Sequence, residues 1–148
     1  MLVSGLIGCT VQSEPVDGPE QVVLEFVRDY GNWAQAGFTE DVPDELERRL
    51  TGDALVSVEG DARWFSESKI VQSGAPRVAS TEIVDSAPDE VTVRLTLDTS
   101  AVSYTSHGKK PNSFDVKVTV TDYTLVRQGT WKIASSKSVD DGIVNRTQ

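Results

Sequence analysis

The chain has 148 residues, of which 38% are hydrophobic and 25% are charged, so one folded domain is expected and wholesale disorder is not. Its formal net charge is −9, and its 14 basic residues are mostly scattered. This argues against nucleic acid as a partner, because phosphate binding requires clustered Lys and Arg. One cysteine and one histidine exclude an internal disulfide and a multi-histidine metal site, and we expect neither a metal nor a cofactor.

The N-terminal segment, residues 1–9, ends in Leu-Ile-Gly-Cys and resembles the lipobox of bacterial lipoproteins. We interpret it as the remnant of a lipoprotein signal that starts further upstream, because a secretory signal has a charged start and a longer apolar run. Cys9 would then carry a lipid such as palmitate, and the polar residues 10–18 would form a tether. The alternative is an unmodified thiol on a frayed terminus.

An amphipathic helix of four to five turns is predicted to begin at Pro19, which suits the first helical position. Glu20 lies in its first turn, where the helix dipole favours a negative charge. Apolar residues follow at spacings of three and four, and we expect this aromatic stripe to pack into the core: Val22, Val23, Phe26, Val27, Tyr30 and Trp33.

The signals between residues 36 and 76 are shorter. Residues 44–50 predict a short helix with its two leucines turned inward, and Thr51–Asp53 breaks it. Residues 54–58 either extend a helix or form a brief strand. A third, irregular helix is predicted over residues 63–71, anchored by Trp64, Phe65 and Ile70.

The remainder of the chain is strand-like. Residues 77–84 predict a strand, residues 85–90 a turn, and residues 91–97 a strand whose apolar side chains alternate cleanly. Residues 98–104 continue or bulge, and residues 105–112 form a polar loop. Last comes a hairpin that turns near Gly129, and the tail, 141–148, is expected to fray. The side chains expected to share the buried faces of this hairpin are Phe114, Val116, Val118 and Val120 in its first strand, and Trp131, Ile133 and Ser135 in its second.

Helices followed by antiparallel strands predict an α+β fold. The sequence resembles the NTF2-like (nuclear transport factor 2-like) superfamily, and within it small secreted lipoproteins of actinobacteria. The resemblance covers the domain at about residues 19–140 and rests on four segments: Thr51–Leu55, Val91–Ser100, Asp122–Arg127 and Gly129–Ile133. It implies a cone in which a curved antiparallel sheet wraps a long N-terminal helix, with two shorter helices and a pocket at one end. Members include isomerases and cyclases as well as proteins without activity, so the fold leaves the function open.

An enzyme of the isomerase or cyclase kind needs a carboxylate base in an apolar pocket, facing hydroxyl donors. The candidate bases are Asp122 and Asp98. Asp122 shares its strand face with Val118 and Val120 if the alternation holds, although a strand edge or bulge pointing to water is the favoured interpretation. Strict alternation turns Asp98 outward. The candidate donors are Tyr30, Tyr104 and Tyr123, and the candidates for lining a ligand pocket are Phe26, Tyr30, Trp33, Trp64 and Tyr104.

The single histidine, His107, lies in a polar Ser-His-Gly-Lys-Lys loop and is expected to be solvated. No nucleophile elbow, phosphate loop or metal-ligand cluster occurs, so nothing in the chain requires an enzyme. We therefore expect a non-catalytic domain that binds a protein partner or a small apolar ligand, held on the extracytoplasmic face of the cell membrane through Cys9. The alternatives are a small isomerase- or cyclase-like enzyme, and a homodimer formed through the sheet face.

Overall fold

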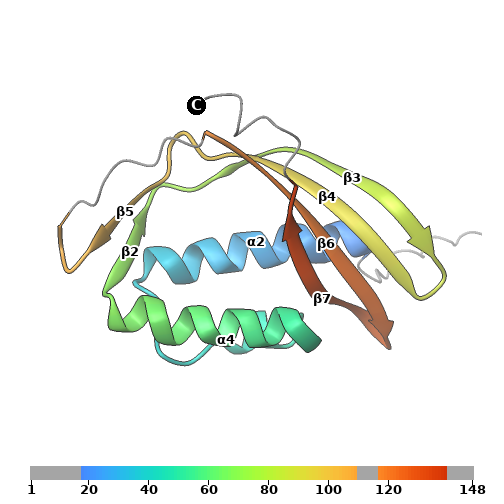
Figure 1. Ribbon diagram of the computed structural model, residues 1–148, viewed down its shortest axis with the longest axis horizontal. Helices are drawn as coiled ribbons and strands as arrows, with labels where there is room; N and C mark the ends of the chain where they lie inside the picture. Colours follow the sequence, from blue (N-terminus) through green and yellow to red (C-terminus); the bar gives the residue numbers. More distant parts are fainter. Residues whose placement is uncertain (1–17, 110–116, 140–148) are drawn as a thin grey trace, which may run out of the picture.

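The computed structural model describes residues 18–109 and 117–139 (Figure 1). In these ranges the helices are α2 (Pro19–Gln35), α3 (Asp44–Glu47) and α4 (Gly52–Glu67). The strands are β2 (Ile70–Ser73), β3 (Arg77–Ala87), β4 (Glu90–Asp98), β5 (Ser103–Ser106), β6 (Val118–Gln128) and β7 (Thr130–Ser138). The predicted α+β class is confirmed.

All strand pairs within the two sheets are antiparallel. The larger sheet has the strand order β3-β4-β6-β7, and β2 pairs with β5 in a separate ribbon. Figure 1 shows the strands arching over α2, with α4 alongside it. Helix α2 contacts strands of both sheets, and α4 contacts β7 and β2. The curved antiparallel sheet expected from the sequence is therefore present.

Helix α2 begins where the sequence predicts. Gly18 is extended and Pro19 occupies the first turn, where a missing N–H costs nothing. The helix ends at Gln35, and Gly37 follows with a φ of 96°, a conformation that favours glycine. The face that it buries consists of Val22, Val23, Phe26, Trp33 and Ala34, so the stripe serves the core as expected.

Helix α4 decides one open alternative of the sequence analysis and corrects one expectation. It is one continuous helix of 16 residues, so residues 54–58 are helical and no separate irregular helix exists over 63–71. Ala54, Val58 and Ala62 are buried at spacings of four, the period of one helix face. Helix α2 has 17 residues, so it and α4 are of nearly equal length, and α3 is the short one of the three described helices.

The core lies between the helices and the concave side of the larger sheet. Its most deeply buried side chains come from α2, α3 and three strands: Val23, Leu46, Val93, Leu95, Leu125 and Ile133. Removing one such side chain from water stabilises the fold by about 1.5–3 kcal/mol.

The face of β6 that points inward is the opposite of the one predicted. Val93 lies opposite Tyr123 and Val91 opposite Leu125, and directly opposed residues share a sheet face. Leu125 is fully buried, whereas Val118 leaves 37% of its surface exposed. The valines expected inside therefore lie on the outer face. Phe114 and Val116 fall outside the described residues.

In β7, Trp131 and Ile133 are buried as predicted. The pairing then shifts, because Leu125 lies opposite Ile133 but Thr124 lies opposite Ser135. One extra residue on β7 reverses the alternation, as a β-bulge does. Ser136, and not Ser135, consequently faces the interior.

Other strand boundaries also differ from the prediction, and residues 105 and 106, expected in a loop, belong to β5. Strand β3 runs to Ala87 and β4 starts at Glu90, so the turn expected over residues 85–90 is only two residues long. Residues 70 and 71, expected at the end of a helix, form β2 with β5 as its partner. Lys69 precedes β2 with a φ of 53°, which ends the helical path.

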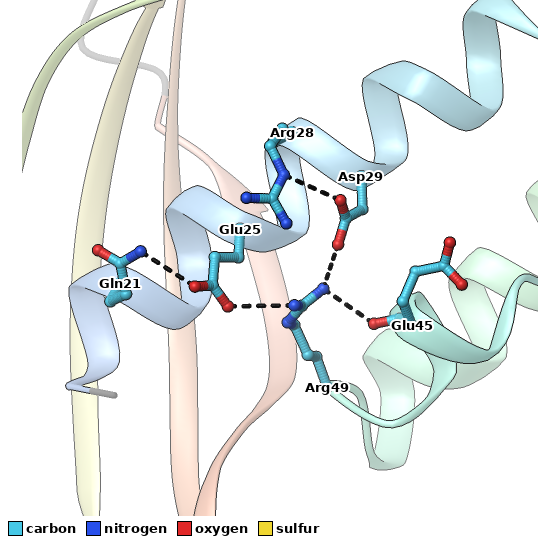
Figure 2. Close-up of polar contacts among 6 residues, drawn as sticks. All are labelled: Gln21, Glu25, Arg28, Asp29, Glu45 and Arg49. Atoms are coloured by element: carbon cyan, nitrogen blue, oxygen red, sulfur yellow. Dashed lines mark hydrogen bonds and ion pairs between the residues drawn. The ribbon is translucent and has the colours of Figure 1, made fainter. Parts of the chain in front are cut away.

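An arginine cluster joins the segment after α3 to α2 (Figure 2). Arg49 donates to Glu25 at 3.1 Å, to Asp29, and to the backbone carbonyl of Glu45 at 2.9 Å. Only 13% of the Arg49 side chain is exposed. The Arg49 carbonyl also accepts a hydrogen bond from the N–H of Ile133, so the same residue ties α2 to β7.

Candidate functional site

A cavity of about 340 Å³ lies between α2, α4 and the strands. Most of its wall is apolar and comes from both helices and the larger sheet, chiefly Phe26, Val27, Leu50, Val58, Leu97 and Ile133. Polar groups also converge on it: Tyr30, Asp61, Gln72, Tyr104, Thr119 and Tyr123. A concave, mainly apolar site with a few converging polar groups is the usual form of a small-molecule site.

The central polar contact of the cavity is a carboxylate–tyrosine pair. Tyr30 of α2 donates its hydroxyl proton to Asp61 Oδ2 of α4, over 2.9 Å. Burial raises the pKa of Asp61, and the hydrogen bond from Tyr30 opposes that rise only in part. Burial, with the nearby Asp61 charge, also raises the pKa of Tyr30, so this hydroxyl keeps its proton.

Two further tyrosines line the same cavity. Burial raises the pKa of Tyr123 to about 12 and raises that of Tyr104 as well. Tyr104 of β5 lies opposite Gln72 of β2, so both point to the same side of the ribbon. Gln72 is buried and donates through Nε2 to the carbonyl of Gly74 at 3.0 Å.

The described wall of the cavity carries negative charge without positive charge. Among the described residues that line it, Asp61 is the single charged side chain, and no Lys, Arg or His is present. Asp61 Oδ1 and Gln72 Oε1 accept no hydrogen bond from the described part of the chain. Two of the unmet polar atoms of the wall are thus hydrogen-bond acceptors, and the hydroxyl of Tyr123, which has no hydrogen-bond partner in the described part of the chain, can also donate.

Of the residues predicted to line a pocket, Phe26, Tyr30 and Tyr104 do so. Trp33 packs in the core and donates its indole N–H to Thr39 at 2.9 Å, so it does not reach the cavity wall. Trp64 is 61% exposed. It follows the buried Ala62 by two positions, which turns it about 200° away from the sheet side of α4.

The two carboxylates proposed as bases lie elsewhere. Asp122 is on the outer face of the sheet, where Arg94 donates to both of its oxygens at 2.8 and 3.0 Å. The hydrogen bonds from Arg94 lower the pKa of Asp122. Asp98 accepts hydrogen bonds from Ser100 and Arg77, chiefly from Ser100, and these lower its pKa to about 2. Neither carboxylate lines the cavity.

The carboxylate that does line the cavity was not among the predicted candidates. Asp61 follows Ala54 by seven positions and Val58 by three, which places it on the apolar face of one helix. This spacing can be read from the sequence, but the prediction divided residues 52–67 into two short elements and so concealed it. A carboxylate inside an apolar helix stripe is the pattern that finds it.

The remaining predicted sites are placed as follows. His107 lies in an exposed turn with a φ of 54° and is remote from the cavity lining. Cys9 falls outside the described residues. Within the described ranges, no helix is long and apolar enough to cross a membrane, and no group of three or more His, Cys, Asp or Glu side chains is arranged to hold a metal ion.

Comparison with known proteins yields no matching family model and no matching curated protein. Solved structures do match. The intermembrane-space region of the chloroplast protein ARC6 superposes with a TM-score of 0.55 at 17% identity, over 83% of this chain and 98% of that one. A putative aromatic ring hydroxylase from Novosphingobium aromaticivorans gives a TM-score of 0.43 at 10% identity, over 84% and 98% of the two chains. At these identities the likeness concerns the fold alone.

Proposed function

We propose that this chain is an NTF2-like cone domain that binds a small, largely apolar ligand in the cavity between α2, α4 and the sheet. The observation that carries the proposal is the cavity itself, which the core side chains leave open. Its apolar wall would hold the body of a ligand, and the polar groups around Tyr30 and Asp61 would orient its polar end.

The proposal retains the membrane tether. The lipobox-like segment that ends at Cys9 supports attachment of a lipid, which would hold the domain on the extracytoplasmic face of the cell membrane. Metabolic labelling with palmitate tests this part. Label should appear on the natural chain and be absent from Cys9→Ala; a natural chain without label contradicts the anchor.

The ligand-binding part is tested with the neutral fluorescent probe N-phenyl-1-naphthylamine. Its emission should rise on addition of the protein, with a single site per chain. Val58→Trp places a large side chain in the cavity wall and should abolish the rise, whereas Val56→Trp, on the exposed side of the same helix, should not. Equal emission with both variants would show that the dye binds elsewhere.

A second candidate is an isomerase- or cyclase-like enzyme. The observation that favours it is a partly buried carboxylate, Asp61, in a cavity that Tyr104 and Tyr123 also line. Asp61 would remove a proton next to a substrate carbonyl, and a tyrosine hydroxyl would donate to the developing oxyanion. Asp61 takes the place of Asp98 and Asp122 in this version.

The enzymatic version is tested with 3-cyclohexen-1-one, whose conversion to the conjugated enone is followed by ultraviolet absorbance. Asp61→Asn should reduce a measured rate by about 100-fold or more. Asp122→Asn should leave the rate unchanged, because that carboxylate is on the far side of the sheet. A rate that survives in Asp61→Asn removes this candidate.

Dimer formation through the sheet face also stays a proposal. It is supported by the partly exposed Val118 on the outer face of the sheet, the face that also carries the Arg94–Asp122 pair. Light scattering should give twice the monomer mass, and Val118→Lys should reduce it to the monomer mass. A monomer at high concentration would contradict the proposal.

A further inference from the structure

The cavity is built to neutralise a positive charge and not a negative one. The single charged group in its described wall is the carboxylate of Asp61, and no described Lys, Arg or His faces it. An anionic ligand such as a fatty acid would meet a carboxylate with no cation to offset it, at a cost that grows as water is excluded.

Aromatic rings line the same cavity as the carboxylate of Asp61. Phe26, Tyr30 and Tyr123 line the cavity, and the ring of Phe26 lies 5.8 Å from that of Tyr30 and 6.1 Å from that of Tyr123. Tyr104 adds a fourth ring from β5. Aromatic faces attract organic cations through the ring quadrupole, and the attraction increases when the cation is desolvated.

Two oxygens of the cavity wall lack a hydrogen-bond donor, and a cation with N–H groups could supply one to each. Asp61 accepts one hydrogen bond through Oδ2 and keeps Oδ1 available, and the buried Gln72 keeps its amide oxygen available. An alkylammonium head group carries up to three donors and no acceptor. A carbonyl ligand offers only acceptors, so it would leave both oxygens unmet.

From this combination we infer that the ligand of the cavity is a lipophilic amine, bound as its ammonium ion with Asp61 as counter-ion and its apolar body against the helices. The inference rests on the proposed ligand-binding function and specifies the ligand's chemical class. An ammonium ion would also offset the cost of holding an ionised carboxylate in an apolar wall.

The test compares three probes with the same apolar chain: octylammonium, octan-1-ol and octanoate, titrated calorimetrically into the whole domain at neutral pH. Octylammonium should bind about tenfold or more tightly than octan-1-ol, and octanoate should bind most weakly. Asp61→Asn should reduce the affinity for octylammonium to about that for octan-1-ol. Glu59→Gln removes an exposed carboxylate from the same helix and should change neither affinity.

The pH dependence gives an independent readout. The other titratable groups that line the cavity in the described chain are Tyr30 of α2, Tyr104 of β5 and Tyr123 of β6, and each keeps its proton at neutral pH. Octylammonium affinity should therefore fall as pH decreases through the raised pKa of Asp61, and octan-1-ol affinity should stay constant.

The possible failures are distinguishable. If octan-1-ol binds as tightly as octylammonium, or if Asp61→Asn keeps the preference for the ammonium, the inference is overturned and the ligand-binding function stands. If none of the three probes binds and N-phenyl-1-naphthylamine shows no rise in emission, the proposed function fails together with the inference.

Discussion

At the scale of single residues, Asp61 shows how a binding group lowers the stability of a fold. Its carboxylate is partly buried, and burial raises its pKa above the ordinary value. A raised pKa in the folded state means that folding stability is largest when the group is protonated and decreases as pH rises through that pKa.

Asp61→Asn should therefore be more stable than the natural chain at pH 7. The amide keeps an oxygen that can accept the Tyr30 hydroxyl, so the hydrogen bond can persist without the charge. The gain should not exceed about 1 kcal/mol, because solvent still reaches part of the carboxylate. Urea denaturation at pH 7 and near pH 4 measures it, and the gain should shrink at the lower pH. A loss of stability at pH 7 would contradict this account.

Gly74 is a second residue with a specific role. Its φ is +75°, and a β-carbon added there would lie 2.1 Å from the backbone oxygen of Ala101. Its own carbonyl accepts hydrogen bonds from Gln35 and Gln72, so it holds the ribbon next to α2.

Gly74→Ala should destabilise the domain by about 3 kcal/mol or more, because both the left-handed backbone and the contact with Ala101 oppose the new methyl group. Gly108 is the matched control, since its φ is +77° but nothing lies within 4 Å of the β-carbon position. Gly108→Ala should cost only the backbone term of about 1–2 kcal/mol. Thermal unfolding of the two variants separates the cost of the left-handed backbone from the cost of the contact with Ala101. Equal losses of stability would show that Ala101 moves aside to accommodate the methyl group.

At the scale of elements, Arg49 fastens the short segment after α3 to α2. Burial alone would raise the pKa of Asp29, but hydrogen bonds from Arg28 and Arg49 outweigh it and lower the pKa. A hydrogen bond from Gln21, followed by the charge of Arg49, lowers the pKa of Glu25. Arg49 therefore compensates two carboxylates that the packing keeps largely from water.

Arg49→Met should destabilise the domain by about 2–4 kcal/mol, because it leaves Glu25 and Asp29 partly buried without the guanidinium that they share. Arg28→Met is the control, since Arg28 also pairs with Asp29 but is 61% exposed, and it should cost less than about 1 kcal/mol. Urea titrations at pH 7 measure both. Similar losses of stability in the two variants would show that the burial of Arg49 does not strengthen its contribution to the free energy of unfolding.

The elements also show what could and could not be predicted from the sequence. Helix α2 was predictable because Pro19 and a long 3.6-residue apolar period agree. Helix α4 was not, because two glycines and small buried residues such as Ala54 and Ala62 weaken its periodicity. The inward face of β6 was mistaken because valine and threonine both suit strands, and only the register against Val93 on β4 decides between them. Asp61 was missed as a direct consequence of the division of α4.

At the scale of the whole molecule, four carboxylates are more acidic in the folded chain than in the unfolded one. The pKa values of Glu25, Asp29, Asp98 and Asp122 are all lowered, by hydrogen bonds from Gln21, Arg28 or Arg49, Ser100, and Arg94 respectively. Asp61, whose pKa is raised, is the opposite case among the described carboxylates. The two kinds of group make opposite contributions to stability as the solution is acidified.

The sign follows from proton linkage. Between the lowered pKa values and the ordinary carboxyl pKa near 4, the unfolded chain binds more protons than the folded one, so acid favours unfolding. Stability should thus fall steeply below about pH 4, whereas the opposite contribution of Asp61 changes it by no more than about 1 kcal/mol between pH 7 and 4. In Arg49→Met the decrease below pH 4 should be shallower, because Glu25 and Asp29 then titrate closer to their unfolded values. Urea midpoints measured at half-unit pH intervals test this, and parallel curves for the two proteins would show that the acid sensitivity arises outside the arginine cluster.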